Sequence, residues 1–329
     1  MKRLTFILVG CALVASIGNA FAESNGWNPD ALKYTRPKTL AVEITTPSKA
    51  QLDIVKRPPT ISKEARDPRP TTTPPPPVEI GGVSVLRLMF RDTDGDLVPA
   101  LYCRPPGRAG KLPLVVIVHG ASTNKAQMCA ELAPPFNRNG FAVIAPDLPM
   151  HGERVGNSQN FWDTHDARKS ADLIHQAVTD IRQCIDAAEQ MPEIDTSRGV
   201  ILVGYSFGSW VTSVAGPLDP RVRAMVLMSG GARDNRVSKD DPNANDPEVL
   251  SVDPTLALQH FVGRPLLMIN GKDDQTILPE VATRLFGAAS EPKKQSWYDT
   301  GHALPPQANG EAAKWSAATW QKLPPLDKN

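Results

Sequence analysis

Short apolar runs alternate with amphipathic segments from about residue 80 to residue 322. A strand that is covered on both faces reads as a continuous apolar run, so these runs predict buried strands. Their spacing, with helical segments between most of them, predicts a mostly parallel, doubly wound α/β sheet. The predicted strands are Val83–Arg91, Leu97–Arg104, Leu112–Val118, Phe141–Ala145, Gly199–Val203, Val222–Met228, Pro265–Ile269 and Lys294–Tyr298.

Helices are predicted where apolar residues recur every three to four positions. The clearest case is Asp166–Gln190, in which Ile174, Val178, Ile181 and Ile185 lie on one helical face. The other predicted helices are Lys125–Leu132, Ser209–Ala215, Leu278–Ala289 and Glu311–Gln321.

Turn-forming residues divide these elements. Asp94-Gly95 predicts a tight hairpin between the first two strands, which makes the start of the sheet antiparallel. Gly216-Pro217 is expected to end the helix at Ser209–Ala215. The polar residues 232–254 are expected to form a loop rather than a lid of packed helices.

The N-terminal residues carry the pattern of an export signal. Two basic residues precede an apolar run that ends near Ile17, and Ala20-Phe21-Ala22 offers a small-x-small cleavage site. The pattern predicts a signal peptide over residues 1–22 and a periplasmic or secreted protein. The run is shorter than the roughly 20 residues of a membrane-spanning helix, so no membrane span is expected. The alternative is a lipid anchor at Cys11, because Leu8-Val9-Gly10-Cys11 resembles a lipobox.

Residues 23–80 are rich in proline and poor in apolar periodicity. Proline fixes φ and removes a backbone donor, so this stretch predicts an extended, partly disordered arm or linker before a catalytic domain at 81–325. After signal cleavage three cysteines remain, Cys103, Cys129 and Cys184. They permit one disulfide in an oxidising compartment and leave one thiol.

Composition narrows the chemistry. The 36 Lys and Arg residues nearly balance the 35 Asp and Glu residues, so no broad basic surface for nucleic acid is expected. No cysteine lies in a C-x-x-C pair, which argues against a zinc site or dithiol chemistry. We therefore expect no metal and no cofactor.

The pattern G-x-S-x-G of a nucleophile elbow occurs at Gly204-Tyr205-Ser206-Phe207-Gly208. The serine of this motif lies at a sharp turn between a strand and a helix, and glycine lets the two elements pass closely. Here the strand Gly199–Val203 precedes Ser206 and a predicted helix follows it. The order of the elements predicts that Ser206 is a nucleophile.

A serine nucleophile needs a base, and the base needs an acid that orients it. Of the six histidines, only His302 follows the candidate acids in the chain order Ser, Asp, His. Asp273 and Asp274 both follow the strand Pro265–Ile269. The form Gly-x-x-Asp favours Asp274 as the acid, with Asp273 as the alternative.

An oxyanion hole needs two backbone N–H groups aimed at the charge that develops on the substrate. One is predicted at Phe207, the residue after the nucleophile. The other is predicted in the loop after the strand that ends at Val118. Ala121 is the preferred donor in that loop, and Gly120 or Ser122 is the alternative.

Together these motifs resemble the α/β-hydrolases over about residues 80–322. The resemblance rests on His119-Gly120, Gly204-x-Ser206-x-Gly208, Gly271-x-x-Asp274 and Gly301-His302. It implies an α/β-hydrolase fold, with a mostly parallel doubly wound sheet, an N-terminal antiparallel hairpin and no large lid domain.

The hairpin before His119-Gly120 and the segment Pro146–Arg154 resemble one branch of these hydrolases, the dienelactone hydrolase-like, acetyl xylan esterase-like and prolyl oligopeptidase-like proteins. True dienelactone hydrolases use a cysteine nucleophile, and this chain has Ser206. Their substrate is therefore not implied.

Four further residues near the predicted strand ends are candidates for binding substrate. They are His119, Tyr205, His151 and Arg154. Arg154 is suited to hold a substrate carboxylate, and the alternative is an ion pair with the nearby Glu153 or Asp147. Asp147 itself is expected to organise its loop rather than to act in catalysis.

The motifs favour an exported serine hydrolase that cleaves carboxylic esters, either small molecules or polymer-borne, through an acyl-enzyme. A peptidase or amidase of the prolyl oligopeptidase-like type uses the same groups, but the residues before the domain are too few for a propeller. The third hypothesis is a non-catalytic binding protein on the same scaffold, and a complete triad argues against it.

Overall fold

The computed structural model describes residues 26–62, 64–158, 166–233, 242–243 and 245–327. The predicted signal peptide, with its cleavage site at Ala22 and the alternative anchor Cys11, lies outside the described residues. No helix among the described residues is both long and apolar enough to cross a membrane.

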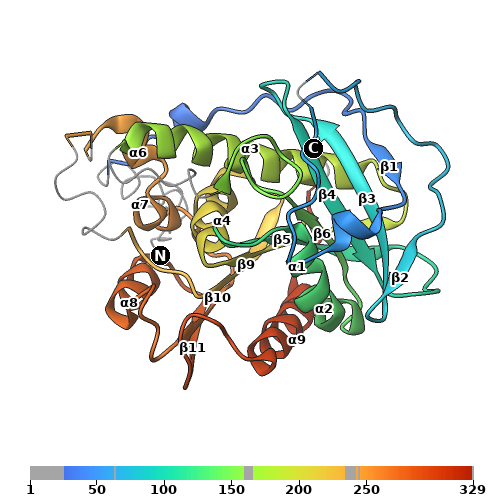
Figure 1. Ribbon diagram of the computed structural model, residues 1–329. Helices are drawn as coiled ribbons and strands as arrows, with labels where there is room; N and C mark the ends of the chain where they lie inside the picture. The colour runs from blue at the N-terminus through green and yellow to red at the C-terminus, as the bar shows by residue number, and fades with distance from the viewer. Residues whose placement is uncertain (1–25, 63, 159–165, 234–241, 244, 328–329) are drawn as a thin grey trace, which may run out of the picture.

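A twisted sheet forms the centre of the domain, and helices cover both of its faces (Figure 1). The strand order is β1-β3-β4-β6-β5-β8-β9-β10-β11. In addition, β2 pairs with β3, and β7 pairs with β5. The strands are β1 Glu43–Thr45, β2 Val78–Ile80, β3 Val83–Arg91, β4 Leu97–Arg104, β5 Leu112–Val118, β6 Ala142–Pro146, β7 Ile194–Asp195, β8 Val200–Tyr205, β9 Val222–Met228, β10 Leu266–Gly271 and β11 Lys293–Tyr298.

The sheet begins antiparallel and continues parallel. β3 pairs with β4, and β4 with β6, in antiparallel register, whereas the neighbours from β6 to β11 are parallel. The chain leaves β5 for β6 and then crosses back to β8 on the other side of β5. The predicted fold class is confirmed, and the carboxyl ends of β5 and β8 lie at the switch point where such sheets bind ligands.

Two layers of helices bury alternate residues of the strands. Leu114, Val116 and Val118 of β5 pack in the core with α3 and α4, while Val115 and Ile117 pack in the core with α1, α2 and α9. This alternation is the two-residue period of a strand covered on both faces. The helices are α1 Lys125–Glu131, α2 Ala133–Arg138, α3 Ala167–Glu189, α4 Phe207–Leu218, α6 Pro247–Ser251, α7 Pro254–Leu258, α8 Pro279–Ala288 and α9 Pro306–Lys322.

The helix after the elbow does not stop at Gly216-Pro217, so that expectation was wrong. α4 continues to Leu218 and includes both residues. A proline in the last turn removes one backbone hydrogen bond, and burial of the helix outweighs this loss. Gly216 permits the burial, because a Cβ at this position would lie 2.3 Å from Met225 Sδ.

The expectation of a plain loop at 232–254 was wrong for its C-terminal part. α6 and the following α7 each begin with an Asp-Pro pair, at Asp246-Pro247 and Asp253-Pro254. Each aspartate accepts hydrogen bonds from backbone N–H groups in the first turn, and proline at N1 starts the helix. Within the segment 232–254, residues 234–241 and 244 lie outside the described residues.

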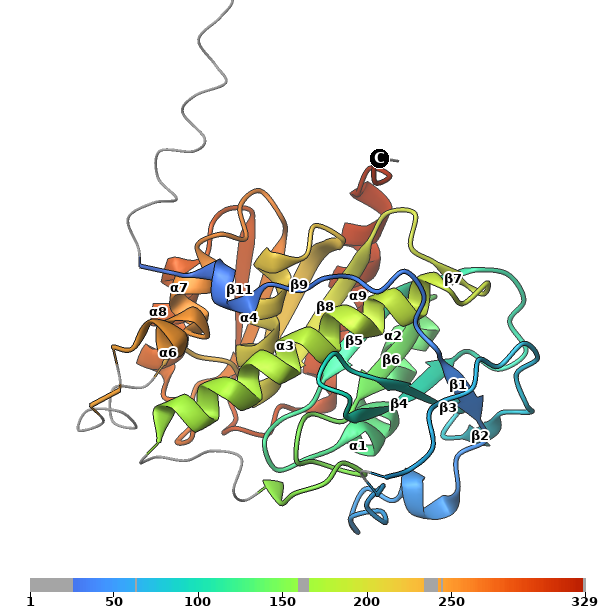
Figure 2. The same ribbon diagram turned by 90° about the horizontal axis from the view of Figure 1, so that it is seen from above.

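Residues 26–77, called the arm below, lie along the domain. Figure 2 shows this segment passing over α3 towards the edge of the sheet, where β1 pairs with β3. Trp27 Nε1 donates to the Ser251 carbonyl of α6, and Tyr34 donates to Asp186 of α3. The arm therefore makes contacts with elements at both ends of the domain.

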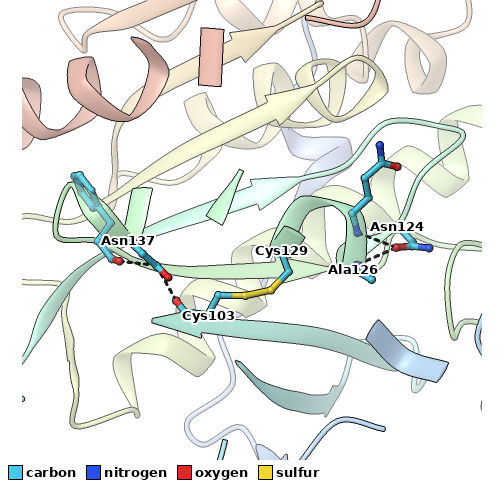
Figure 3. The surroundings of a disulfide bond; sticks show 7 residues. Cys103, Asn124, Ala126, Cys129 and Asn137 are labelled. Carbon is cyan, nitrogen blue, oxygen red and sulfur yellow. Dashed lines mark hydrogen bonds between the residues drawn. A yellow bond between two sulfur atoms is a disulfide. The ribbon is translucent and has the colours of Figure 1, made fainter. Parts of the chain in front are cut away.

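Cys103 in β4 and Cys129 in α1 form a disulfide (Figure 3). Asn137 Nδ2 donates to the Cys103 carbonyl, which ties α2 to the same strand. Among the described residues, Cys184 is the remaining thiol, and it is buried in α3. Burial raises the pKa of the Cys184 thiol well above its ordinary value, so this group is unreactive in the folded domain.

Candidate active site

Ser206 lies in a strained turn between β8 and α4. Its φ is 54° and its ψ is −116°, in a region that residues other than glycine rarely occupy. Backbone contacts fix this conformation, because Ser206 N donates to the Met228 carbonyl at 2.7 Å and Ser209 N donates to the Ser206 carbonyl at 2.9 Å. The turn also puts Phe207 at the first position of α4, where helix N–H groups and the positive end of the helix dipole favour a negative charge.

Gly208 lets α4 begin directly against the end of β5. A Cβ at this position would lie 2.1 Å from the Val118 carbonyl oxygen. We expect Gly208→Ala to lower the free energy of unfolding by about 3 kcal/mol, because backbone must move to relieve the overlap. Gly310→Ala is the matched control, since this α9 glycine has open space around it and should gain about 0.5–1 kcal/mol. Urea unfolding of both variants measures the difference, and equal stabilities would contradict the argument.

The structure brings Ser206, His302 and Asp274 together. His302 Nε2 lies 2.8 Å from Ser206 Oγ, and His302 Nδ1 lies 2.8 Å from Asp274 Oδ2. Asp274 is fully buried, whereas the His302 side chain is 28% exposed. The other Asp274 oxygen accepts from the N–H groups of Thr276 and Ile277. The alternative acid, Asp273, is exposed.

Two hydroxyl groups hold the backbone of His302 by hydrogen bonds to its carbonyl. Tyr205 and Ser229 both donate to the His302 carbonyl, at 3.0 and 2.8 Å. The Tyr205 hydroxyl also accepts from Leu304 N. The contacts of Tyr205 are thus with the His302 loop, and Ser229 is a supporting residue that sequence reasoning missed. The only sequence signal for Ser229 was its place directly after a predicted strand.

The predicted oxyanion loop, residues 119–122, lies beside the nucleophile. A Cβ on Gly120 would lie 3.2 Å from Ser206 Cβ. The Gly120 carbonyl accepts from His119 Nδ1 at 2.7 Å and from Thr123 N at 3.2 Å. Because a peptide unit is planar and its C=O and N–H point in opposite directions, these bonds also orient the N–H of Ala121.

His119 is fully buried and acts on this loop rather than at the surface of the site. Its Nε2 accepts from Leu148 N at 2.9 Å, so the ring is neutral with its proton on Nδ1. Burial, together with the nearby His151 and Lys125, holds the pKa of His119 well below its ordinary value.

The depressed pKa of His119 predicts acid sensitivity of the fold. Below pH 6.5 the unfolded chain takes up a proton at this residue that the folded protein excludes, so stability falls as pH drops. His119→Asn keeps a donor near the Nδ1 position and cannot titrate. Between pH 6.5 and 5.5 the wild type should lose about 1 kcal/mol more than this variant. Urea unfolding at both pH values measures this, and parallel losses would contradict the assignment.

His151 also contacts the oxyanion loop. Its Nε2 lies 2.6 Å from the Ala121 carbonyl oxygen, and its Nδ1 lies 2.7 Å from that of Pro149. Burial lowers the pKa of His151, which opposes the two carbonyls that favour its charged form. The ring is 1% exposed, so we assign it to the support of the loop and not to the substrate surface.

Arg154 is not brought to the site. It is buried and pairs with Asp180 and with Asp92, the latter at 3.1 Å. The prediction that Arg154 pairs with Glu153 or Asp147 was therefore wrong. The reason is that the chain turns at Gly152, which sends Arg154 towards α3 and the β3–β4 hairpin.

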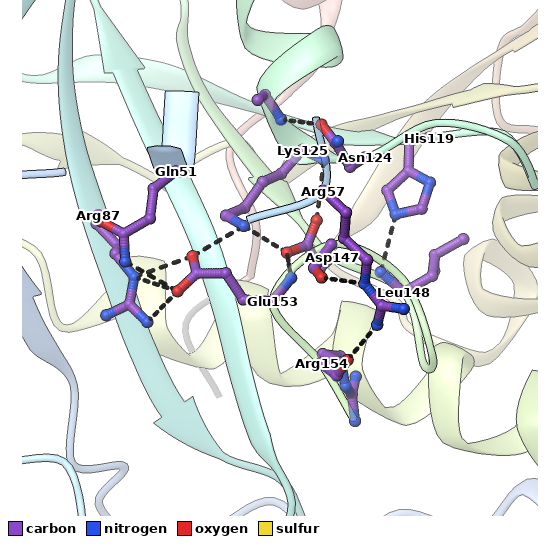
Figure 4. A network of polar contacts seen from close by, with 12 residues as sticks. Gln51, Arg57, Arg87, His119, Asn124, Lys125, Asp147, Leu148, Glu153 and Arg154 are labelled. Atoms are coloured by element: carbon purple, nitrogen blue, oxygen red, sulfur yellow. Dashed lines mark hydrogen bonds and ion pairs between the residues drawn. The ribbon is translucent and has the colours of Figure 1, made fainter. Parts of the chain in front are cut away.

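Glu153 and Asp147 belong instead to a buried network around Lys125 (Figure 4). Lys125 pairs with both carboxylates, and Arg87 pairs with Glu153 at 2.7 Å. Burial disfavours the charge of Glu153, but Lys125 and Arg87 outweigh it and hold the pKa below its ordinary value. Lys125 is the first residue of α1, so this network anchors the start of the helix that follows the oxyanion loop. Asp147 thus organises its loop as predicted.

Comparisons with known proteins agree with this architecture. The family model described as the alpha/beta hydrolase family matches residues 115–326, well over half of the chain. The chain is 26% identical over 239 residues to Esterase YjfP of Escherichia coli, covering 64% of this chain and 91% of that protein.

Solved structures share the fold at low sequence identity. Acetyl xylan esterase 1 from Thermoanaerobacterium sp. is 18% identical with a TM-score of 0.65, over 91% of this chain and 94% of that one. The acetyl xylan esterase from Paenibacillus sp. R4 is 18% identical with a TM-score of 0.63, over 91% and 93%. From its family match, its fold and its similarity to these proteins, the chain belongs to the α/β-hydrolase family and is a serine hydrolase.

Proposed function

We propose that the protein is an exported hydrolase of carboxylic esters that works through a Ser206–His302–Asp274 triad. The observation that carries the proposal is the unbroken line of contacts from Ser206 Oγ through both nitrogens of His302 to Asp274, with 2.8 Å at each step. The names of the similar proteins, Esterase YjfP and the acetyl xylan esterases, support an ester as the substrate class.

The protonation states follow from the partners. A carboxylate only accepts hydrogen bonds, so Nδ1 of His302 carries the proton that binds Asp274. Nε2 is then free to accept the proton of Ser206 as its oxygen attacks the ester carbonyl. The N–H groups of Phe207 and Ala121 bind the oxyanion, and loss of the alcohol leaves an acyl group on Ser206. Water, deprotonated by His302, releases the acid and restores the serine.

A fluorophosphonate probe tests the nucleophile. We expect a covalent adduct on Ser206, found by mass spectrometry of the peptide, and loss of p-nitrophenyl ester hydrolysis in step with labelling. Ser209 and Ser213 follow in the next turns and serve as internal controls, because both are buried. Absence of label, or label on another serine, would reject the proposal. Turnover of peptide amides but not of esters would replace it with an amidase.

Export is the second part of the proposal. The Cys103–Cys129 disulfide supports it, because structural disulfides persist mainly in oxidising compartments. Expression with the full N-terminus should yield a mature protein that begins after Ala22. Intact-mass measurement checks this, and a mass increased by a lipid on Cys11 would favour the anchored alternative.

A further inference from the structure

Residues 148–154, called the brace loop here, contact the oxyanion loop. Leu148 N donates to His119 Nε2 at 2.9 Å, and His151 Nε2 lies 2.6 Å from the Ala121 carbonyl. Both ring nitrogens of His151 face carbonyl oxygens, and a neutral ring has one N–H, so the ring donates to Ala121 in the tautomer with its proton on Nε2, which is the tautomer that the proposal below assigns. The brace loop thus contacts the His119 ring before the predicted oxyanion donor, Ala121 N, and the Ala121 carbonyl after it.

The brace loop has a strained backbone. Met150 has a φ of 63°, which is strained for a residue other than glycine, and Gly152 has a φ of 52°, which glycine adopts readily. The loop also winds closely around Asp147, because a Cβ on Gly152 would lie 2.1 Å from its carboxylate. Strained residues keep their conformation only where surrounding contacts enforce it. The outer contacts of the brace loop therefore determine how well its inner contacts are placed.

The arm supplies those outer contacts, and Arg57 makes most of them. Its guanidinium donates to the carbonyls of Gly152 at 2.9 Å, Arg154 at 2.6 Å and Met150 at 3.4 Å. Ile61 N donates to the Glu153 carbonyl at 2.8 Å. Figure 4 shows Arg57 reaching from the arm to the backbone of this loop. One planar side chain thereby ties together carbonyls on both sides of His151.

We propose that Arg57 is a positioning residue for the oxyanion hole. It acts through the brace loop and His151 on the peptide that follows Ala121. The proposal rests on the ester hydrolase function given above, because the oxyanion hole stabilises negative charge only in that reaction. It assigns to the proline-rich arm a part in turnover, although none of the triad contacts is made by the arm.

Arg57→Ala should lower kcat about 10-fold and leave KM within about 2-fold. A displaced oxyanion donor weakens binding of the transition state more than binding of the substrate, and loss of a whole donor costs about 10²–10³ in kcat. Arg57→Lys should recover part of the loss, since an ammonium donates to the same carbonyls. Arg66→Ala is the control, because this arm arginine pairs with Glu43 of β1, and it should keep wild-type kcat.

A double-mutant cycle tests whether Arg57 acts on the oxyanion hole through His151. His151→Phe removes the donor to Ala121 and should lower kcat at least as far as Arg57→Ala. If Arg57 acts through His151, the double variant should be no slower than His151→Phe alone, since residues that act in series are not additive. Multiplied losses in the double variant would overturn this route.

Hydrogen exchange gives a readout that does not depend on activity. In Arg57→Ala, amides of residues 119–125 should exchange faster than in the wild type, and in Arg66→Ala they should not. Unchanged exchange there, or equal kcat losses in the two arm variants, would overturn the proposal. If the wild type hydrolyses no ester while Arg57→Ala still loosens residues 119–125, the proposed function fails and the positioning contact stands.

Discussion

Ser206→Ala is expected to lower kcat for p-nitrophenyl acetate by about 10⁴–10⁶-fold, because the variant has no atom to form the acyl-enzyme. The residual rate would come from binding and from the oxyanion donors alone. Stability should change little. Ser206 Oγ bonds to His302 Nε2, and one such hydrogen bond contributes about 1 kcal/mol. The backbone contacts that fix the turn do not involve the hydroxyl.

Ser213→Ala is the matched control for this substitution. Its hydroxyl is buried in α4 and donates to the Ser209 carbonyl within the same helix, so its loss should leave kcat within about 2-fold. Measuring kcat and the thermal unfolding midpoint of both variants separates an effect on the reaction from an effect on folding. Ser206→Ala activity within 100-fold of the wild type would mean that another group is the nucleophile. A fall in activity that accompanies unfolding would leave the serine's chemical role without support.

The sheet was predictable because its strands are buried on both faces. Val115 to Val118 read as one apolar run, and the structure gives the alternate residues of that run to two separate cores. The chain order of the candidate triad was also readable, since the fold places each residue just after a strand. Turn chemistry explains the short helices that were missed. Asp253-Pro254 is a helix start, and its meaning depends on the packing of α7 against α4.

Contacts that close over long sequence distances were not predictable in the same way. Arg154 lies next to Glu153 in sequence, yet it pairs with Asp180 on α3 and Asp92 in the hairpin. The reach of Arg57 to the brace loop spans about 95 positions, and proline-rich sequence gives no periodic pattern that would indicate a docking face. The role of Ser229 was equally hard to predict, because its hydroxyl binds a carbonyl more than 70 positions away. A single sequence shows which residues can donate or accept but not which carbonyls they will meet.

Asp274→Asn and Asp273→Asn form the second decisive pair. An asparagine at 274 can still accept from the Thr276 and Ile277 amides, so the loop should keep its shape. Its Nδ2, however, would face His302 Nδ1 with a donor in place of an acceptor. The ring would then favour the tautomer with its proton on Nε2, which cannot accept the proton of Ser206. We expect kcat to fall by about 10³–10⁴-fold with unfolding midpoints within a few degrees.

Asp273→Asn should leave kcat within about 2-fold, because this carboxylate is exposed and its backbone N–H, which the substitution retains, donates to the Thr300 carbonyl. Steady-state kinetics on one ester, run in parallel for both variants, decide between the two candidate acids. The reverse outcome, a large loss at 273 and none at 274, would transfer the orienting role to Asp273. Equal and small losses would imply that His302 is oriented chiefly through its carbonyl by Tyr205 and Ser229. The carboxylate would then be a structural cap for the turn at Thr276.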